Sequence, residues 1–357
     1  ARLADARRVA EELPGGMVDL SVGTPLDPPS EAVVATLAAT DRARVYPPSV
    51  GTSELRAAAA RWMSGRFGVD IEIEQIAASV GSKEFVAGLP HWLRLRTPER
   101  DTVLYPAVSY PSYEMGATLA GCRAVAVPVD DRWRLDLSAI DGDDAARALC
   151  LWVNTPGNPA GGLDNLDAIA EWGRANDVLV ASDECYIAFT WDGPPQSVVS
   201  SGLDGVLAVH SLSKRSNLAG VRVGFYVGDP EIVGYLGEVR KHAGFMVPGP
   251  AQAAAVAAFG DESHVEQQRK RYFERLEVMQ RVAARLGADA PLPGGGFYLW
   301  VPAPDGDAWA FARRLAQEAG ALVSPGEFYG GAAADHVRVA VVQPTERIEL
   351  VAERLGL

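Results

Sequence analysis

The chain is poor in cysteine and histidine and lacks the motifs that hold a metal. Its three cysteines, Cys122, Cys150 and Cys185, are widely spaced without a CxxC pair, and its five histidines form no HExxH or other close pair. An odd, dispersed set of thiols argues against a disulfide framework and is typical of a reducing compartment. We therefore expect no metal site and a cytoplasmic location. Cys122 and Cys150 lie in apolar runs, so we expect both in the core.

Long hydrophobic runs and nucleotide-binding glycine loops are also missing. No apolar stretch approaches the roughly 20 residues of a membrane span. There is neither a GxGxxG nor a GxxxxGK[ST] motif. Acidic residues outnumber basic ones by 46 to 33, which gives a formal net charge of −13. This balance argues against nucleic acid and anionic membranes as partners and leaves small molecules as the expected ligands.

The sequence does contain the pattern of a two-domain α/β protein. It has 357 residues, 48% of them hydrophobic, which is enough for more than one core. Short, nearly continuous apolar runs alternate with helical segments such as 53–68, 83–95 and 165–176. Buried strands that alternate with helices predict a mostly parallel sheet covered on both faces. Residues 45–243 are therefore predicted to form a large α/β domain.

The pattern changes after residue 243. A long amphipathic helix is predicted over 263–287, and shorter strands and helices follow it. We assign 1–44 and 244–357 to an N-terminal arm and a smaller α+β domain. The proline-rich stretches 24–30 and 248–250 are the expected crossing points between the two domains.

Polar clusters follow several of the predicted strands. In an open parallel sheet the carboxyl ends of the strands meet at one edge, where ligands bind. A helix start there would suit a phosphate, and a carboxylate, a phenol and a lysine among serines follow further along the chain. These residues are Gly81, Ser82, Lys83, Asp183, Tyr186, Ser211, Ser213 and Lys214. Each cluster alone is an ordinary turn or cap, and a lysine at a strand end usually points into water.

Together the clusters match the needs of pyridoxal 5'-phosphate. This cofactor requires a lysine amine for its Schiff base, an acid beside the pyridinium nitrogen, and donors for the phosphate. A buried carboxylate such as Asp183 would stabilise the ring proton by charge pairing. We therefore predict that Lys214 is a nucleophile and proton shuttle rather than a surface lysine.

In this combination and order, the motifs resemble those of the class I aminotransferases of pyridoxal-phosphate fold type I. The stretches concerned are "NPAG", "DECY" and "SLSKR" followed by "GVRVG", and the resemblance extends from "DLSVGTP" to "HVRVAVV". It implies a large cofactor-binding α/β domain with a smaller α+β domain, and a homodimer with shared active sites.

The resemblance also implies roles for individual residues. Lys214 corresponds to the cofactor lysine and Asp183 to the pyridinium carboxylate. Tyr186 and Asn158 would share the ring hydroxyl, and Tyr110 would stack on the ring. The implied phosphate ligands are Gly81, Ser82, Lys83, Ser211, Ser213 and Arg222, with Tyr46 reaching the phosphate of the partner subunit.

On the substrate side, Arg338 corresponds to the arginine that binds the α-carboxylate, with the backbone of Gly23 opposite. The family usually has threonine where this chain has Ala160, which removes a hydroxyl but leaves Asn158 in place. Taken singly, Arg338 is equally well a surface strand residue, and Tyr46 equally well a packing residue.

Longer stretches resemble the actinobacterial succinyldiaminopimelate aminotransferases of lysine biosynthesis. This implies N-succinyl-LL-2,6-diaminopimelate as amino donor and 2-oxoglutarate as acceptor, giving glutamate. The two additional carboxylates of that donor need cations when they are desolvated. We predict Lys83 and Arg215 for this role, with Lys241 or His242 assisting across the dimer. Arg240 is interpreted as the positive end of a helix.

Other functions stay open at this point. Another class I aminotransferase, with an aspartate, aromatic or similar donor, or a β-lyase would use the same cofactor residues. A decarboxylase is disfavoured by Arg338, which would hold the carboxylate in place. A non-catalytic effector-binding domain should lack Lys214, Asp183 or Arg338 and carry a DNA-binding segment. All three residues are present and we find no such segment in the sequence.

Overall fold

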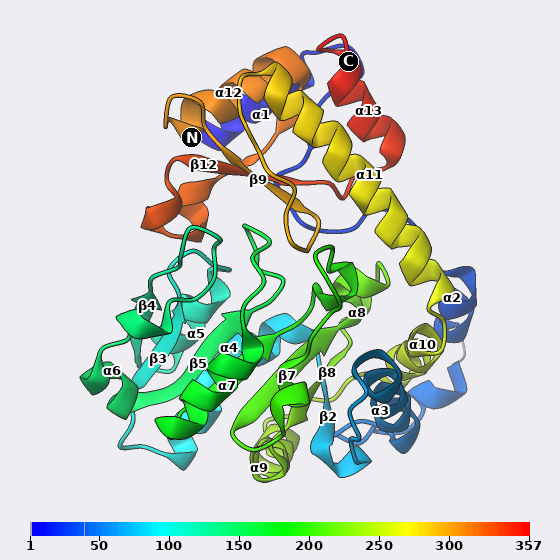
Figure 1. Cartoon of the computed structure of the whole chain (residues 1–357). Helices are drawn as coiled ribbons and strands as arrows, with labels where there is room; N and C mark the ends of the chain where they lie inside the picture. Colours follow the sequence, from blue (N-terminus) through cyan, green and yellow to red (C-terminus); the bar gives the residue numbers. More distant parts are fainter. Residues whose placement is uncertain (1, 39) are drawn as a thin grey trace.

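A seven-stranded mixed sheet forms the centre of the larger of two domains (Figure 1). It is seen in a computed structural model that describes residues 2–38 and 40–357. The order is β2-β8-β7-β6-β5-β3-β4, and only β8 runs antiparallel to its neighbours. The predicted mostly parallel sheet is confirmed. The strands are β2 (Ile76–Ser79), β3 (Thr102–Pro106), β4 (Arg123–Val127), β5 (Ala148–Asn154), β6 (Leu179–Asp183), β7 (Val206–Ser211) and β8 (Gly224–Gly228).

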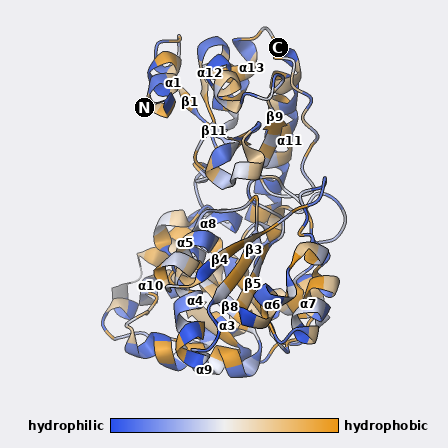
Figure 2. Ribbon diagram, turned by 90° about the vertical axis from the view of Figure 1, so that its left-hand side faces the viewer, coloured by the Kyte–Doolittle hydropathy of each residue, from blue (hydrophilic) through white to orange (hydrophobic). Residues whose placement is uncertain are grey.

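Apolar side chains cover both faces of this sheet. In β5, Leu151 and Val153 join one buried cluster while Cys150 and Trp152 join another, because successive residues of a strand point to opposite faces. Figure 2 shows the central strands as hydrophobic and the surrounding helices as mixed. The helices are α3 (Ser53–Phe67), α4 (Ser82–Arg96), α5 (Ser112–Leu119), α6 (Gly142–Arg147), α7 (Leu166–Ala175) and α9 (Pro230–His242). Cys150 is a core residue as expected, whereas Cys122 is only partly buried.

The smaller domain lies beyond the carboxyl ends of the parallel strands (Figure 1). Its antiparallel sheet has the order β11-β12-β9, and a second, two-stranded sheet pairs β1 with β10. These strands are β1 (Val18–Asp19), β9 (Tyr298–Pro302), β10 (Ala321–Leu322), β11 (Ser324–Pro325) and β12 (His336–Ala340). The helices are α1 (Arg2–Glu11), α11 (Ser263–Arg285), α12 (Ala308–Ala319) and α13 (Thr345–Glu353). No helix in the described part of the chain is both long and apolar enough to cross a membrane.

The structure places the domain boundaries differently from the predicted 45 and 243. Helices α2 (Glu31–Leu37) and α10 (Gly249–Phe259) both contribute to the core of the large domain, for example through Val33 and Ala255. Helix α10 is apolar around most of its circumference, so it has to be buried within a domain core. The stretch 24–30 does connect the domains, but the second crossing lies between α10 and α11 and not at 248–250.

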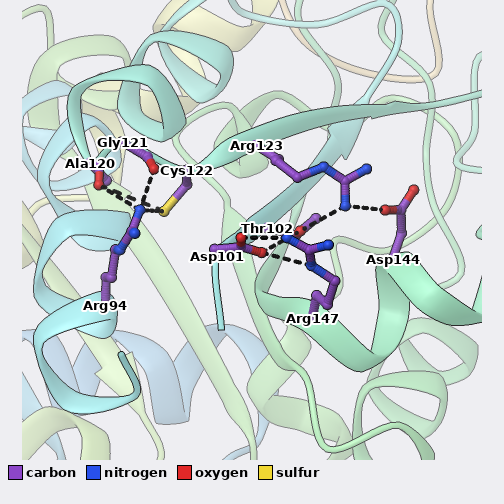
Figure 3. Close-up of polar contacts among 9 residues, drawn as sticks. All are labelled: Arg94, Asp101, Thr102, Ala120, Gly121, Cys122, Arg123, Asp144 and Arg147. Atoms are coloured by element: carbon purple, nitrogen blue, oxygen red, sulfur yellow. Dashed lines mark hydrogen bonds and ion pairs between the residues drawn. The ribbon is translucent and has the colours of Figure 1, made fainter. Parts of the chain in front are cut away.

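Ion pairs connect the elements at the amino-terminal edge of the large sheet, which is the edge opposite the polar strand ends (Figure 3). The Asp101 carboxylate accepts from Arg147, with 2.9 Å between Arg147 Nε and Oδ1, and Arg123 Nη1 lies 2.8 Å from Asp144 Oδ1. Arg94 donates to the carbonyl group of Ala120 at the end of α5. The side chains of the two ion pairs are 19–49% exposed, so solvent screens them and each pair adds little stability.

A buried ion pair ties the crossing segment 24–30 to helix α11. Arg275 Nη1 and Nη2 donate to the two carboxylate oxygens of Asp27 over 2.6 and 2.8 Å, and Arg275 is 1% exposed. Gln268 Nε2 donates to Asp27 Oδ2 at 2.8 Å. Burial alone would raise the pKa of Asp27, but the hydrogen bonds from Arg275 and Gln268 hold that pKa below its usual value.

We expect the substitution Arg275→Met to lower the free energy of unfolding by about 3–5 kcal/mol at pH 7, because it leaves the Asp27 carboxylate buried and unpaired. The pKa of Asp27 is lowered in the folded state, so the contribution is complete above the ordinary aspartate pKa of about 3.9. It is lost as the pH falls through the lowered value. Urea unfolding at several pH values measures both effects.

The matched control is Lys270→Met, which removes an exposed pair with Glu274 from the same helix. It should cost less than about 1 kcal/mol. Equal losses for the two variants would show that the Asp27 pair does not stabilise the fold.

Candidate active site

A cavity of about 610 Å³ lies between the two domains at the carboxyl ends of the parallel strands, the position at which open α/β sheets bind ligands. The structure brings most of the predicted residues to its wall. They are Gly23, Ser82, Lys83, Tyr110, Asn158, Asp183, Tyr186, Ser213, Lys214, Arg222 and Arg338.

Lys214 lies on a single helical turn, α8 (Leu212–Arg215), that follows β7 directly. Ser211 ends the strand and caps this turn, because its Oγ accepts from Ser213 N at 3.1 Å. The Lys214 ammonium donates to the carbonyl oxygen of Gly23. Burial lowers the pKa of Lys214 to about 8. An amine with this pKa is partly unprotonated near neutral pH, which is what a nucleophile or proton acceptor requires.

Asp183 ends β6 and is 4% exposed. Its Oδ2 accepts from the hydroxyl of Tyr113 at 3.1 Å and its Oδ1 from Cys185 N at 3.3 Å. Burial raises the pKa of this carboxyl group, because both donors are neutral and water is excluded. A carboxylate in this position suits a cationic ligand atom, and the protonated ring nitrogen of pyridoxal phosphate is such an atom.

The predicted phosphate loop stands where β2 is followed by α4. Gly81 precedes the helix with φ +72°, and a Cβ at this position would lie 2.2 Å from Arg222 Nη2. Arg222 is held over the loop by hydrogen bonds from Nη1 to Ala219 O at 2.7 Å and from Nη2 to Val80 O at 3.3 Å. Free amides at a helix start together with an arginine fit a phosphate group.

Arg338 on β12 is buried in the cavity wall and is not a surface strand residue. Its Nη1 donates to Asn158 Oδ1 at 2.8 Å and its Nη2 to Ser21 O at 2.7 Å. The guanidinium carbon lies 4.2 Å from the ring centroid of Tyr298 and 4.7 Å from that of Tyr329. The two rings fix the plane of the Arg338 guanidinium group, which suits bidentate binding of a carboxylate.

Sequence reasoning missed three tyrosines that line this cavity, Tyr113, Tyr298 and Tyr329. Tyr113 bonds Asp183, and the Tyr298 hydroxyl lies 2.8 Å from that of Tyr186. Tyr113 stands on α5 and Tyr298 on β9. Both are ordinary places for core aromatics, so the sequence offered no signal that distinguished them.

Arg215 was predicted to hold a distal carboxylate, and the structure contradicts this. Its Nη1 donates to Ala258 O at 2.8 Å, it pairs with Glu262, and it packs against Trp62 and Phe259. Successive residues of a helical turn are about 100° apart. Since Lys214 points into the cavity, Arg215 is directed into the core.

Three other predicted residues lie away from the cavity wall of their own chain. Tyr46 is 92% exposed, and Lys241 and His242 are exposed as well, with Lys241 Nζ 3.4 Å from Glu238. Their roles across a dimer stay predictions. Arg240 stands in the last turn of α9, as interpreted, but it is 1% exposed and bonded to Glu84. Its role is therefore more than that of a positive helix end.

Comparisons with known proteins agree with this geometry. Residues 15–355 match the model of the family described as aminotransferase class I and II. The chain is 41% identical to 4-dedimethylamino-4-oxo-anhydrotetracycline transaminase OxyQ of Streptomyces rimosus, over 96% of this chain and 94% of that protein. It is 34% identical to LL-diaminopimelate aminotransferase of Aquifex aeolicus, over 98% and 94%.

The solved structure of an aminotransferase from Neisseria meningitidis superposes with a TM-score of 0.90 at 30% identity and covers 99% of this chain and 95% of that one. Enzymes of this family depend on pyridoxal 5'-phosphate. The lysine, the buried carboxylate and the arginine-backed helix start described above fit that cofactor. The chain therefore belongs to the class I and II aminotransferases and is a pyridoxal-phosphate-dependent aminotransferase.

Proposed function

We propose that the enzyme transfers the amino group of N-succinyl-LL-2,6-diaminopimelate to 2-oxoglutarate. The observation that carries this proposal is a cation in the cavity in addition to Lys214, Arg222 and Arg338. Arg338 suits the α-carboxylate, and Lys83 also lines the wall, with its Nζ 5.8 Å from the ring centroid of Tyr110. Lys83 forms no ion pair with a described residue, so its charge is available for a distal carboxylate. The relative named LL-diaminopimelate aminotransferase supports a donor with this carbon skeleton.

The residues that would hold the cofactor follow from the site. Asp183 would face the ring nitrogen, Tyr186 and Asn158 the ring hydroxyl, and Tyr110 the ring face, while the loop of Ser82 with Arg222 would bind the phosphate. Once bound, pyridoxal phosphate supplies an electron sink for the substrate α-carbon. Lys214 would remove the proton from that carbon, and in the second half of the reaction it would return a proton to the α-carbon of the acceptor. The lowered pKa of Lys214 favours both roles. Arg338 would hold the carboxylate and so keep it from being lost.

We also infer that a second copy of the chain completes the cavity. Exposed apolar side chains gather at its rim, where Val22 is 56% and Phe328 42% exposed and both line the cavity. Val45 and Tyr46, on the segment that precedes α3, are 72% and 92% exposed. A partner subunit would cover these side chains and would receive Tyr46 near its own phosphate site.

The test is a panel of amino donors with 2-oxoglutarate, in the wild type and in Lys83→Met. The wild type should prefer the succinylated donor. The variant should raise the KM for that donor by about 10–100-fold, because one charged hydrogen bond worth about 1.5–3 kcal/mol is lost. Glutamate serves as the second donor in a single-turnover half-reaction without 2-oxoglutarate, and its apparent affinity should change little because glutamate is shorter.

Two controls separate this proposal from its alternatives. Arg338→Lys should impair every donor alike, because all carry an α-carboxylate. Turnover without an oxo acid would indicate a β-lyase. Equal effects of Lys83→Met on both donors would contradict the succinylated substrate. A polycyclic ketone should be included as an acceptor, since the relative from Streptomyces rimosus is named for one.

A further inference from the structure

An ion pair between a buried arginine and a partly buried glutamate lies directly behind the predicted phosphate loop. Arg240 on α9 donates from Nη1 to Glu84 Oε2 at 3.0 Å and from Nη2 to Glu84 Oε1 at 2.5 Å. Arg240 is 1% exposed, and Glu84 lies in the first turn of α4, two residues after Ser82. The pair thus joins α9 to the first turn of α4, the helix that follows the loop, although the two helices are far apart in the sequence.

Glu84 is bonded to the backbone of the loop as well. Its Oε1 accepts from Val80 N at 2.8 Å. The carbonyl oxygen of Val80 accepts from Arg222 Nη2 at 3.3 Å. Val80 immediately precedes Gly81, so both polar backbone groups of Val80 are held by charged side chains. The direction in which the following amides point is therefore set by Glu84 on one side and Arg222 on the other.

The surroundings of Arg240 hold its guanidinium in one place. Its central carbon lies 4.8 Å from the ring centroid of Phe245, 5.4 Å from that of Phe85 and 5.6 Å from that of Tyr226. A fully buried charge is costly unless it is paired in good geometry. A cation that only complemented the end of α9 would remain in water, where it would gain the same dipole interaction without that cost.

We propose that Arg240 and Glu84 are positioning residues for the cofactor phosphate. Arg240 fixes the Glu84 carboxylate, Glu84 fixes the Val80 peptide, and the peptide aims the amides of Gly81 and Ser82. Neither side chain lines the cavity, so they act through the loop and not by contact with the cofactor. The inference rests on the proposed assignment of Ser82 and Arg222 to the phosphate.

The test compares the affinities of the full-length apoenzyme for pyridoxal phosphate and for pyridoxal, which lacks the phosphate, by absorbance titration. Arg240→Met should weaken the binding of pyridoxal phosphate by about tenfold or more, the loss expected when one charge-assisted hydrogen bond is misplaced. The affinity for pyridoxal should stay unchanged. Glu84→Gln, which keeps an acceptor for Val80 N but loses the charge, should shift the ratio in the same direction by less. If Arg240→Met does not fold, the Glu84→Gln variant tests the proposal in its place.

Arg275→Met is the matched control, because it breaks a buried arginine–carboxylate pair between α11 and the crossing segment 24–30. It should lower stability and leave the ratio of the two affinities unchanged. The ratio compared is the affinity for pyridoxal phosphate divided by the affinity for pyridoxal. If Ser82→Ala and Arg222→Met lower this ratio but the Arg240 and Glu84 variants leave it unchanged, this inference alone is overturned. Unchanged ratios in all four variants would overturn the phosphate-loop assignment itself.

Discussion

Replacement of Lys214 by alanine should lower kcat by about 10⁴-fold, the upper range for the loss of a positioned acid–base group. The side chain is a buried amine whose pKa is lowered to about 8 by its surroundings. Neither neighbour on α8 can replace it, because Ser213 is engaged with Ser211 and Arg215 is directed into the core. Single-turnover kinetics with saturating donor measures the effect on the proton transfer separately from product release.

Borohydride reduction of the wild-type holoenzyme, followed by peptide mapping, gives an independent measurement of the same assignment. The cofactor should become attached to the peptide that contains Lys214. Lys83→Met serves as the matched control, since Lys83 also lines the cavity, and it should label normally. Attachment to any other lysine would contradict the role given to Lys214.

Asp183→Asn should lower kcat by about 10²–10³-fold, comparable to the removal of one electrostatic stabiliser from an active site. Without the carboxylate, the ring nitrogen loses the negative charge that keeps it protonated. The apoenzyme should nevertheless be as stable as the wild type or more stable. Burial raises the pKa of Asp183, so a charge at this position opposes folding while no cation is bound. Thermal unfolding of the apoenzyme and steady-state kinetics of the holoenzyme measure the two effects.

Tyr113→Phe is the control for Asp183→Asn, because it removes the hydroxyl that bonds Asp183 Oδ2 and leaves the charge. It should have a much smaller effect on kcat. If Asp183→Asn retained near-normal turnover, another acid would have to hold the ring, and the assignment of Asp183 would be wrong.

The sequence alone determined the fold class and half of the residues that line the cavity. Apolar runs that alternate with helices require a covered parallel sheet, and the strand ends then converge at one edge. Asp183 ends β6 and Lys214 follows β7 because the hydrophobic pattern stops just there. These positions depend on where the local hydrophobic pattern ends, which can be read from the sequence, whereas the strand order came from the structure.

The tertiary structure decided which way a side chain faces and what it contacts. Lys214 and Arg215 are neighbours in the sequence, yet one enters the cavity and the other a core of Trp62 and Phe259. Arg240 has the sequence context of a helix end, but α9 packs so that it meets Glu84. Pairings between residues more than a hundred positions apart, such as those of Arg240 and of Tyr298 with Tyr186, depend on how the elements pack in three dimensions. No local pattern encodes that packing, because the same arginine or tyrosine suits a surface, a core or a site equally well until its neighbours are fixed.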